Sequence, residues 1–489
     1  MPQDTQSVLP FARLAGKNLQ GDFNGGTLSS DGGVLWLRET EAHSGIIGRF
    51  VQALDDRRDP RYTDHSSEEM LSQRVFQIAC GDDDADDGDV LRHDPAFKAA
   101  CGRLPIEGEP LASQPTMSRL ENAPRRSNLY RMAQGLFETF VASYERAPQA
   151  MLGDMDDTAD EVHGAQQQSL FNGYYGAYCY LPLHMYEGQS GKLITSLLRP
   201  GRRSTGPEIV SILTRVVGAI RREWPEVLML LRGDSHFSTP EVHQWGESQE
   251  PVVFYLLGQS GNAVLKREAS FLGDHARSLY QYNQVRAYRQ RAHQERKPCK
   301  ATSKQKTSPS QKQVPIPPTE MRKAKLYTTF PYQAGSWGQP RRLICKAEVS
   351  DEGENIRFVV TNLETPRNAW IYETIYCGRG QMENYLKDHK LFLHSDRTSC
   401  HTCAANQFRL FLHSAAYVLM HTLRTQGLRG TAWAKAPCDQ MQIRILKVGA
   451  RIEELKTKVM FHFPSSFPLT GLYTRVLTNL SRSQLCRSP

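Results

Sequence analysis

Hydrophobic positions between residues 149 and 257 fall into short strand-like runs separated by longer amphipathic stretches. The predicted elements, in chain order, are strands at 151–156, 178–186 and 192–198, a helix at 207–223, a strand at 227–234, a helix at 239–247 and a strand at 251–257. The last two strands are continuously apolar, as expected of strands buried on both faces. Three antiparallel strands followed by alternating helices and strands predict a mixed α/β sheet with helices on both faces.

The segments on either side of this region have a different pattern. The first 147 residues are mostly amphipathic helix and loop, and helices at 113–121 and 128–144 are weakly similar to a helix-turn-helix, with an ordinary helical hairpin equally open. After residue 258, a polar helical stretch and two strands precede a strong helix at 370–390, which predicts an inserted, partly β domain. The predicted division of the chain is 1–147, 148–260, 261–366, 367–430 and 431–489.

The apolar stretches do not predict a membrane protein. The longest, Phe408 to Leu423, is interrupted by Arg409 and His413 and predicts a buried helix. The first residues carry no basic-then-apolar export signal. We therefore expect a cytoplasmic protein, and its 489 residues are enough for several domains.

The positive charge of the chain is concentrated in one segment. Residues 286–325 contain twelve Lys or Arg and two Glu, whereas the whole chain carries a net charge of only +8. A local basic segment is typical of contact with a polyanion, and its Ser-, Lys- and Pro-rich centre is also typical of a disordered linker. Both readings hold together, because disordered basic arms bind nucleic acid.

Two aspartates end two of the predicted strands. Asp156 closes the first and Asp234 the fourth, at the sheet edge where ligands bind in mixed α/β folds. One such Asp is ordinarily a turn or cap residue. Two on one sheet, with a Glu on a later helix, form a donor set suited to two Mg²⁺ ions that catalyse phosphodiester transfer. Asp154 shares a face with Asp156, and Asp157 is the main rival for the first position.

The later helix carries a specific pattern of four polar side chains. Tyr376, Arg379, Glu383 and Lys390 are separated by three, four and seven residues, so an α-helix places them on one face. Arg and Lys bind phosphate, while Glu383 supplies the third carboxylate. A solvated helix face explains any one of these residues, but not readily all four.

This spacing matches the Y-R-E-K signature of bacterial insertion-sequence DDE transposases. Other segments resemble the family numbered thirteen-eighty within that group, and the similarity runs from about residue 20 to 475. These segments are Leu28–Leu35, Asp156–Thr158 with His163–Gly164, Phe171–Tyr175, Arg232–Phe237 and Ala405–Leu410.

The resemblance implies a ribonuclease H-like core, with which the predicted element order agrees, and a helical N-terminal DNA-binding region. It implies cut-and-paste transposition, with Asp156, Asp234 and Glu383 as catalytic metal ligands for two Mg²⁺ ions, for which Mn²⁺ can substitute. Tyr376 and Arg379 would bind the DNA end together with Lys390. The implied partners are double-stranded DNA, as terminal inverted repeats and target, and a second copy in a synaptic homodimer near the nucleoid.

Two other functions remain open. A stand-alone nuclease would keep the same core, although it has little need of the inserted domain. A domesticated, catalytically inactive DNA-binding protein is the other, although all six signature residues are intact. Related enzymes flip a base onto an aromatic ring, for which Trp337 and Trp370 are the candidates here.

Overall fold

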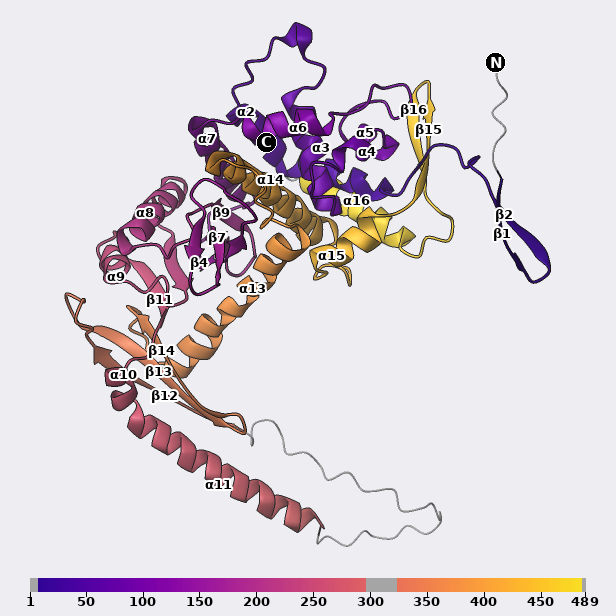
Figure 1. Cartoon of the computed structure of the whole chain (residues 1–489). Helices are drawn as coiled ribbons and strands as arrows, with labels where there is room; N and C mark the ends of the chain where they lie inside the picture. Colours follow the sequence, from indigo (N-terminus) through magenta and orange to yellow (C-terminus); the bar gives the residue numbers. More distant parts are fainter. Residues whose placement is uncertain (1–7, 296–322, 486–489) are drawn as a thin grey trace, which may run out of the picture. The chain divides into compact units, whose positions relative to one another are not determined.

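The computed structural model describes residues 8–295 and 323–485 (Figure 1). The chain forms two compact units, and it passes between them several times. The sheet unit consists of Ala147–Asp156 and Arg203–Gln381, and the helical unit of Met1–Arg146, Asp157–Arg202 and Met382–Pro489. None of the helices in the described ranges is long and apolar enough to cross a membrane.

A mixed sheet organises the sheet unit. Within this unit the strand order is β12-β13-β14-β11-β10-β4. Strands β4, β10 and β11 run parallel, and β14, β13 and β12 follow as an antiparallel meander. The strands are β4 (Ala150–Asp157), β10 (Leu228–Gly233), β11 (Val253–Gln259), β12 (Ala324–Tyr332), β13 (Arg341–Ser350) and β14 (Gly353–Thr361).

Two helices precede β10 and β11 along the chain, as the hydrophobic pattern predicted. In α8 (Gly206–Glu223), Thr205 and Glu208 form a capping box, and apolar side chains four or three residues apart are buried. Helix α9 (Pro240–Glu247) begins at a proline, packs against α8 and lies against β11. The predicted elements occur in the chain order β4, β8 (Leu183–Glu187), β9 (Leu193–Leu197), α8, β10, α9 and β11, which confirms the predicted mixed α/β arrangement.

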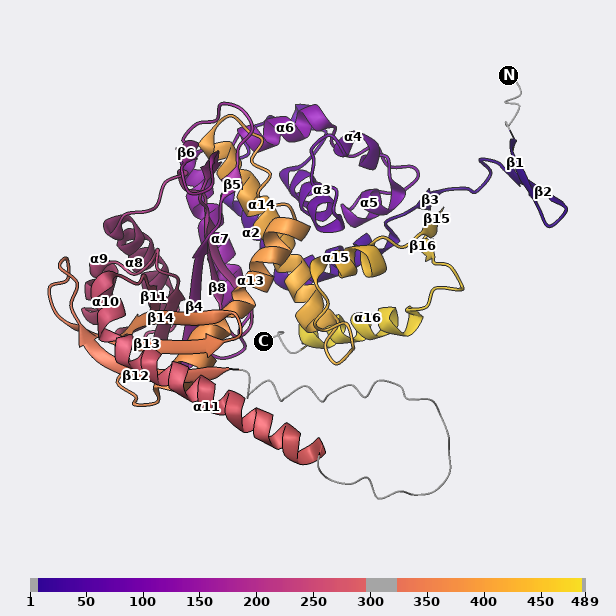
Figure 2. The same ribbon diagram turned by 60° about the horizontal axis from the view of Figure 1, so that its bottom comes forward.

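The meander is covered by helices on both faces. Alternate residues of β13 point in opposite directions, so Ala347 packs against Ala276 of α11 (Ser270–Glu295) while Ile344 packs against Ile371 and Tyr372. A short helix, α10 (Ala263–Glu268), precedes α11, which lies along β12 and β13 (Figure 2). Strand β12 was not predicted, because its first residues fall in the basic segment.

The long helix predicted at 370–390 is helical throughout but changes its winding. Its segments are α12 (Asn368–Trp370), a π-helical turn (Ile371–Tyr376), a 3₁₀ turn (Cys377–Arg379), α13 (Gly380–Lys387) and a second π-helical turn (Asp388–Phe392). These irregular turns lie in the part of the helix that carries the four polar signature residues. π-Helical turns are frequent at functional sites, so their position agrees with a functional role for this helix. Tyr376 and Arg379 belong to the sheet unit, and Glu383 and Lys390 to the helical unit.

The helical unit is built around α14 (Cys403–Thr422), the buried helix predicted from its apolar run. Its side chains are buried on nearly every side by N-terminal helices and by β9. The surrounding helices are α1 (Leu35–Ser44), α2 (Ile46–Ala53), α3 (Ser67–Cys80), α4 (Gly88–Leu91), α5 (Pro95–Ala100), α6 (Gln114–Asn122), α7 (Arg126–Ala142), α15 (Cys438–Met441) and α16 (Thr470–Leu485).

Short strands complete the helical unit. The second predicted strand, 178–186, is divided into β7 (Ala177–Tyr180) and β8 (Leu183–Glu187), because Pro182 lacks the N–H that a continuous ladder requires. Strand β8 pairs antiparallel with β9 (Leu193–Leu197). The remaining strands are β1 (Leu9–Leu14), β2 (Lys17–Gly21), β3 (Leu28–Ser29), β5 (Asp160–Glu161), β6 (Leu170–Asn172), β15 (Ala450–Leu455) and β16 (Lys458–His462).

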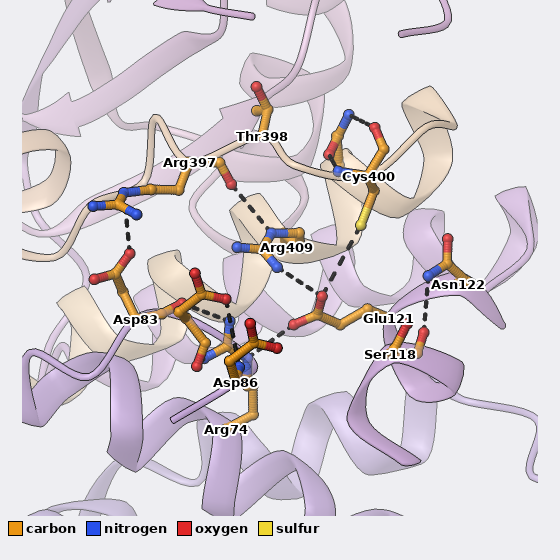
Figure 3. Close-up of polar contacts among 12 residues, drawn as sticks. Arg74, Asp83, Asp86, Ser118, Glu121, Asn122, Arg397, Thr398, Cys400 and Arg409 are labelled. Atoms are coloured by element: carbon orange, nitrogen blue, oxygen red, sulfur yellow. Dashed lines mark hydrogen bonds and ion pairs between the residues drawn. The ribbon is translucent and has the colours of Figure 1, made fainter. Parts of the chain in front are cut away.

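A buried ionic network joins three helices of this unit (Figure 3). The Glu121 carboxylate of α6 accepts from Arg74 Nε of α3 at 2.8 Å and from Arg409 Nη1 of α14 at 2.7 Å. Burial raises the pKa of Glu121, but Arg409 and Arg74 outweigh that effect and hold the pKa below its usual value. The network is therefore ionised, and it ties α6 to the core of the unit.

Candidate active site at the ends of strands β4 and β10

The three aspartates near the end of β4 have different environments. Asp154 is fully buried and forms two hydrogen bonds with Arg232, at 2.6 Å from Nε and 2.7 Å from Nη2. Arg232 lies directly opposite it on β10. Because the buried Arg232 guanidinium binds both carboxylate oxygens, Asp154 and Arg232 form a buried ion pair with a structural role.

Asp157 is held in a similar way within the helical unit. Its carboxylate lies 2.9 Å from Arg199 Nη2, and its side chain is only 4% exposed. Arg199 also donates from Nε to the Leu181 carbonyl at 3.0 Å. This second buried pair fixes the last residue of β4 and gives Asp157 a structural contact of its own.

Asp156, between them, is more accessible. Its side chain is 20% exposed, and its carboxylate lies 3.0 Å from Arg379 Nη2. The same Arg379 nitrogen donates to the Met155 carbonyl at 3.3 Å. A partly exposed carboxylate can exchange a guanidinium partner for a cation at much lower cost than the fully buried Asp154 can.

Asp234 occupies the matching position on the neighbouring strand. Arg232 pairs with Asp154 in the parallel register of β10 and β4, so Asp234 and Asp156 each lie two residues further on. Neighbouring strands are about 4.8 Å apart, which brings the two positions to the same sheet edge. One Asp234 oxygen accepts from the His236 backbone N–H at 2.9 Å, and this local turn orients the carboxylate.

Tyr376 and Arg379 lie beside these aspartates. Burial raises the pKa of the Tyr376 hydroxyl. The nearby Arg379 opposes this shift, and the nearby Asp234 adds to it. The hydroxyl lies so close to Gly258 that a Cβ atom built there would be 2.8 Å from it. Gly258 therefore lets the tyrosine reach over the end of β11. Within the sheet unit, the structure brings Asp156, Asp234, Tyr376 and Arg379 together.

Glu383 and Lys390 belong to the helical unit. Glu383 is exposed on α13. Lys390 Nζ donates to Thr158 Oγ1 at 2.9 Å and lies 3.4 Å from the Asp160 carboxylate. Burial raises the pKa of Asp160 to about 7, although the ammonium of Lys390 opposes the shift. Lys390 also lines a pocket of about 680 Å³ together with His163.

The end of the sheet where β4 and β10 stop provides two of the three predicted ligands for a hard divalent cation. Carboxylate oxygens are the ligands that Mg²⁺ prefers, and Asp156 and Asp234 supply them from adjacent strands. No group of three or more His, Cys, Asp or Glu side chains suited to a metal is found among residues 8–295 and 323–485. Two of the three predicted ligands therefore share one edge of the sheet, and Glu383 stands on the other unit.

The two tryptophans considered for base stacking differ in exposure. Trp337 is buried, with the His243 ring 5.1 Å and the Tyr332 ring 5.5 Å from its own. Trp370 is 46% exposed at the start of the long helix. Only Trp370 presents its ring to solvent, so it is the better candidate of the two.

Sequence comparison decides the family. The family model described as transposase DDE domain group 1 matches residues 11–485. The chain belongs to this family of DDE transposases. Its members form an enzyme class that cleaves and transfers DNA, which confirms the predicted class of activity and DNA as the substrate.

The cryo-EM structure of the piggyBac transposase synaptic complex with hairpin DNA is similar to this DDE transposase, with 11% sequence identity and a TM-score of 0.38 over 86% of this chain and 80% of that chain. No protein of curated function matches the sequence.

Sequence reasoning missed the arginine partners of the site. The Asp154–Arg232 pair joins residues 78 positions apart, and the Asp157–Arg199 pair joins residues 42 apart. The only signal for the first pair was an arginine in an otherwise apolar strand, because a charge in such a strand requires a partner.

Proposed function

We propose that this DDE transposase is of the Y-R-E-K group, family thirteen-eighty, and carries out cut-and-paste transposition of an insertion sequence. Asp156, Asp234 and Glu383 are the proposed catalytic acids and metal ligands. The observation that supports this assignment most is the separation of the β4 aspartates. Asp154 and Asp157 are committed to buried arginines, whereas Asp156 shares the sheet edge with Asp234.

Each residue has a defined role in this proposal. Two Mg²⁺ ions, or Mn²⁺ in their place, would lower the pKa of the attacking water and stabilise the leaving oxygen. Asp156 and Asp234 contribute carboxylates from a rigid sheet edge, which keeps their spacing constant during the reaction. Glu383 contributes the third carboxylate from α13.

The basic residues of the signature are the proposed DNA contacts. Arg379 Nη2 is 3.0 Å from Asp156, so a modest side-chain rotation would move it to a phosphate next to the scissile bond. The Tyr376 hydroxyl is protonated at neutral pH, as a tyrosine ordinarily is, and burial raises its pKa further, so it can donate a hydrogen bond to DNA. Lys390 faces an open pocket from which its ammonium can reach a phosphate.

Terminal inverted repeats, target DNA and a second copy of the chain in a synaptic homodimer are the proposed partners. The N-terminal residues 1–147 would contribute to DNA binding. Residues 148–260 and 367–430 would form the ribonuclease H-like core, with the inserted domain 261–366 between them. Residues 431–489 would form a C-terminal region. A cytoplasmic, nucleoid-associated enzyme follows from these partners.

The substitution Glu383→Gln tests the proposal. The substrate is a plasmid that carries the gene with its native flanking DNA, incubated with Mg²⁺. We expect strand cleavage to fall by at least about 10³-fold, because a neutral amide cannot replace a metal-binding carboxylate, while DNA binding stays within about twofold. Glu364→Gln makes the same chemical change at an exposed position and is the matched control.

The outcomes separate the alternatives. Cleavage at the wild-type rate by Glu383→Gln would remove Glu383 from the site. Cleavage without joining, measured with precut ends and a target plasmid, would indicate a stand-alone nuclease. DNA binding without any cleavage by the wild type, together with flanks that lack inverted repeats, would indicate a domesticated DNA-binding protein.

A further inference from the structure

Helix α11 has two faces of opposite character. Its inner face packs on the meander through Leu272, Ala276 and Tyr280, with Ala287 buried further along. Successive positions are four or seven residues apart and form a single stripe. This stripe accounts for the helix as a structural element and leaves the opposite side to solvent.

The outer face is unusually rich in apolar side chains for a surface helix. Phe271 is 72% exposed, Tyr282 62% and Val285 50%, and Tyr288 at its margin is 74% exposed. Soluble helices normally turn polar residues to solvent, so a row of exposed aromatic rings marks an interaction surface.

The charge of the same face is one-sided. Arg277 is balanced by ion pairs with Asp274 and Glu354. From residue 278 to 290 the helix has no acidic residue, and it carries Arg286 and Arg289, both exposed. No ion pair of either arginine is found within the described part of the chain.

The basic segment predicted from the sequence, residues 286–325, is divided between α11 and β12 in the structure. Its first arginines lie on α11, while Lys323 and Lys325 at the start of β12 lie 3.7 Å from Glu348 and 3.4 Å from Glu373, respectively. Residues 296–322 lie outside the described residues. Among the side chains of α11 that the structure describes, Arg286 and Arg289 are the basic ones of this segment, and no carboxylate partner is found for either within the described residues.

We infer that the outer face of α11, formed by Phe271, Tyr282, Val285, Arg286 and Arg289, binds the phosphate backbone of duplex DNA. Arg286 and Arg289 are three residues apart, about 4.5 Å along the axis, so both reach the same strand of phosphates. The Tyr282 hydroxyl can donate to a phosphate oxygen, and the apolar rings cover the sugars. The inference rests on the proposed function, because it takes DNA as the partner.

This surface is distinct from the candidate active site. Helix α11 packs on β13 and β12, which are three and four strands from β10, so roughly 14–19 Å separate it from the end of that strand within the sheet unit. A second contact at that distance would hold the duplex beyond the reacting phosphate. It is expected to be independent of DNA sequence, because backbone contacts carry no base information.

The double substitution Arg286→Gln with Arg289→Gln tests this inference in the full-length protein. Affinity for a 30-base-pair duplex of arbitrary sequence is measured between 50 and 200 mM salt. Each phosphate contact contributes about 0.9 to the slope of log affinity against log salt, so the slope should flatten by about 1.8. The ratio of wild-type to variant affinity should then fall about 12-fold across that range.

The matched control is Arg215→Gln with Arg222→Gln, which removes the same charge from the exposed side of α8 in the same unit. An unchanged slope for the α11 variant, or an equal change in both variants, would overturn the inference. Sedimentation of both variants tests the other occupant. Loss of a dimer by the α11 variant alone, with the salt slope intact, would show that this face binds a second copy of the chain instead.

Failure here is distinguishable from failure of the proposed function. If the α11 variant keeps the wild-type slope while Glu383→Gln abolishes cleavage, only the DNA surface on α11 is wrong. If the slope flattens while Glu383→Gln still cleaves, the helix binds DNA but the proposed catalytic residue is wrong. Substitution of these exposed arginines leaves the inner face unchanged, so circular dichroism and the melting temperature should match wild type.

Discussion

Substituting each of the three β4 aspartates by asparagine should separate structure from catalysis. The three carboxylates lie within four residues of one another, yet their surroundings differ sharply. Asp154 is 0% exposed, Asp157 has 4% of its side chain exposed, and Asp156 has 20% exposed. Asparagine keeps the shape of the side chain and removes only its charge, so the three variants differ mainly in what their arginine partners lose.

The expected magnitudes follow from burial. Asp154→Asn leaves the buried Arg232 guanidinium without a counter-charge, at a cost of about 3–5 kcal/mol. Asp157→Asn does the same to Arg199, at a comparable cost. Asp156→Asn breaks a partly exposed pair with Arg379, which contributes no more than about 1 kcal/mol. Catalysis should follow the opposite order, because only Asp156→Asn removes a proposed metal ligand.

Native-state hydrogen exchange measures the stability of the strands directly, which matters because a chain with two compact units need not unfold in a two-state manner. A loss of 3–5 kcal/mol corresponds to about a 150- to 4000-fold drop in protection for the amides of β4 and β10 in Asp154→Asn. In Asp156→Asn, protection should stay within about fivefold of wild type while plasmid cleavage is lost. Full cleavage by Asp156→Asn, or a stable but inactive Asp157→Asn, would refute the assignment.

Three further changes probe the helical unit. Glu121→Gln should lower the free energy of unfolding by about 3–5 kcal/mol in a urea titration, because it removes the shared counter-charge of two buried arginines. Asp59→Asn, which breaks an exposed ion pair, is the control and should change the free energy of unfolding by less than about 1 kcal/mol. Asp160→Asn should gain stability relative to wild type as pH rises from 5 to 8 in thermal melts. The Asp160 carboxyl, with its pKa raised to about 7, destabilises the folded wild type once it ionises, and asparagine cannot ionise. A constant difference between the two proteins across that range would contradict this. Gly33→Ala should cost at least about 1–3 kcal/mol, since its Cβ would meet the Ile445 carbonyl oxygen at 2.0 Å. Gly48→Ala, which places its Cβ in open space at an exposed position of α2, should be neutral or slightly stabilising, and differential scanning calorimetry measures both.

The secondary structure of the parallel-strand region was predictable because its signals are local. Continuous apolar runs mark β10 and β11, and the capping pattern at Thr205 marks the start of α8. Strand β12 was missed for the opposite reason. Its exposed, polar alternation follows a basic stretch, and only its pairing with β13 makes it a strand.

The candidate site was predictable in residue type, but not in detail. Spacing along the chain grouped Tyr376, Arg379, Glu383 and Lys390, and the family model confirms the class of enzyme that this pattern indicated. The catalytic assignment of each residue stays a prediction. No local pattern distinguishes Asp154 from Asp156, because the two are alike in type and share one face of the strand.

The sequence alone determined the order of the elements around β10 and β11, the enzyme class and the candidate acids, since periodicity and motif spacing are properties of neighbouring residues. The tertiary structure decided which aspartate is accessible and which arginines are neutralised. Those outcomes depend on partners 42 to 78 residues away, such as Arg232 opposite Asp154 and Arg199 beside Asp157. A carboxylate becomes a structural ion pair or an available ligand according to the charge and burial that surround it in space, and only the folded chain specifies that surrounding.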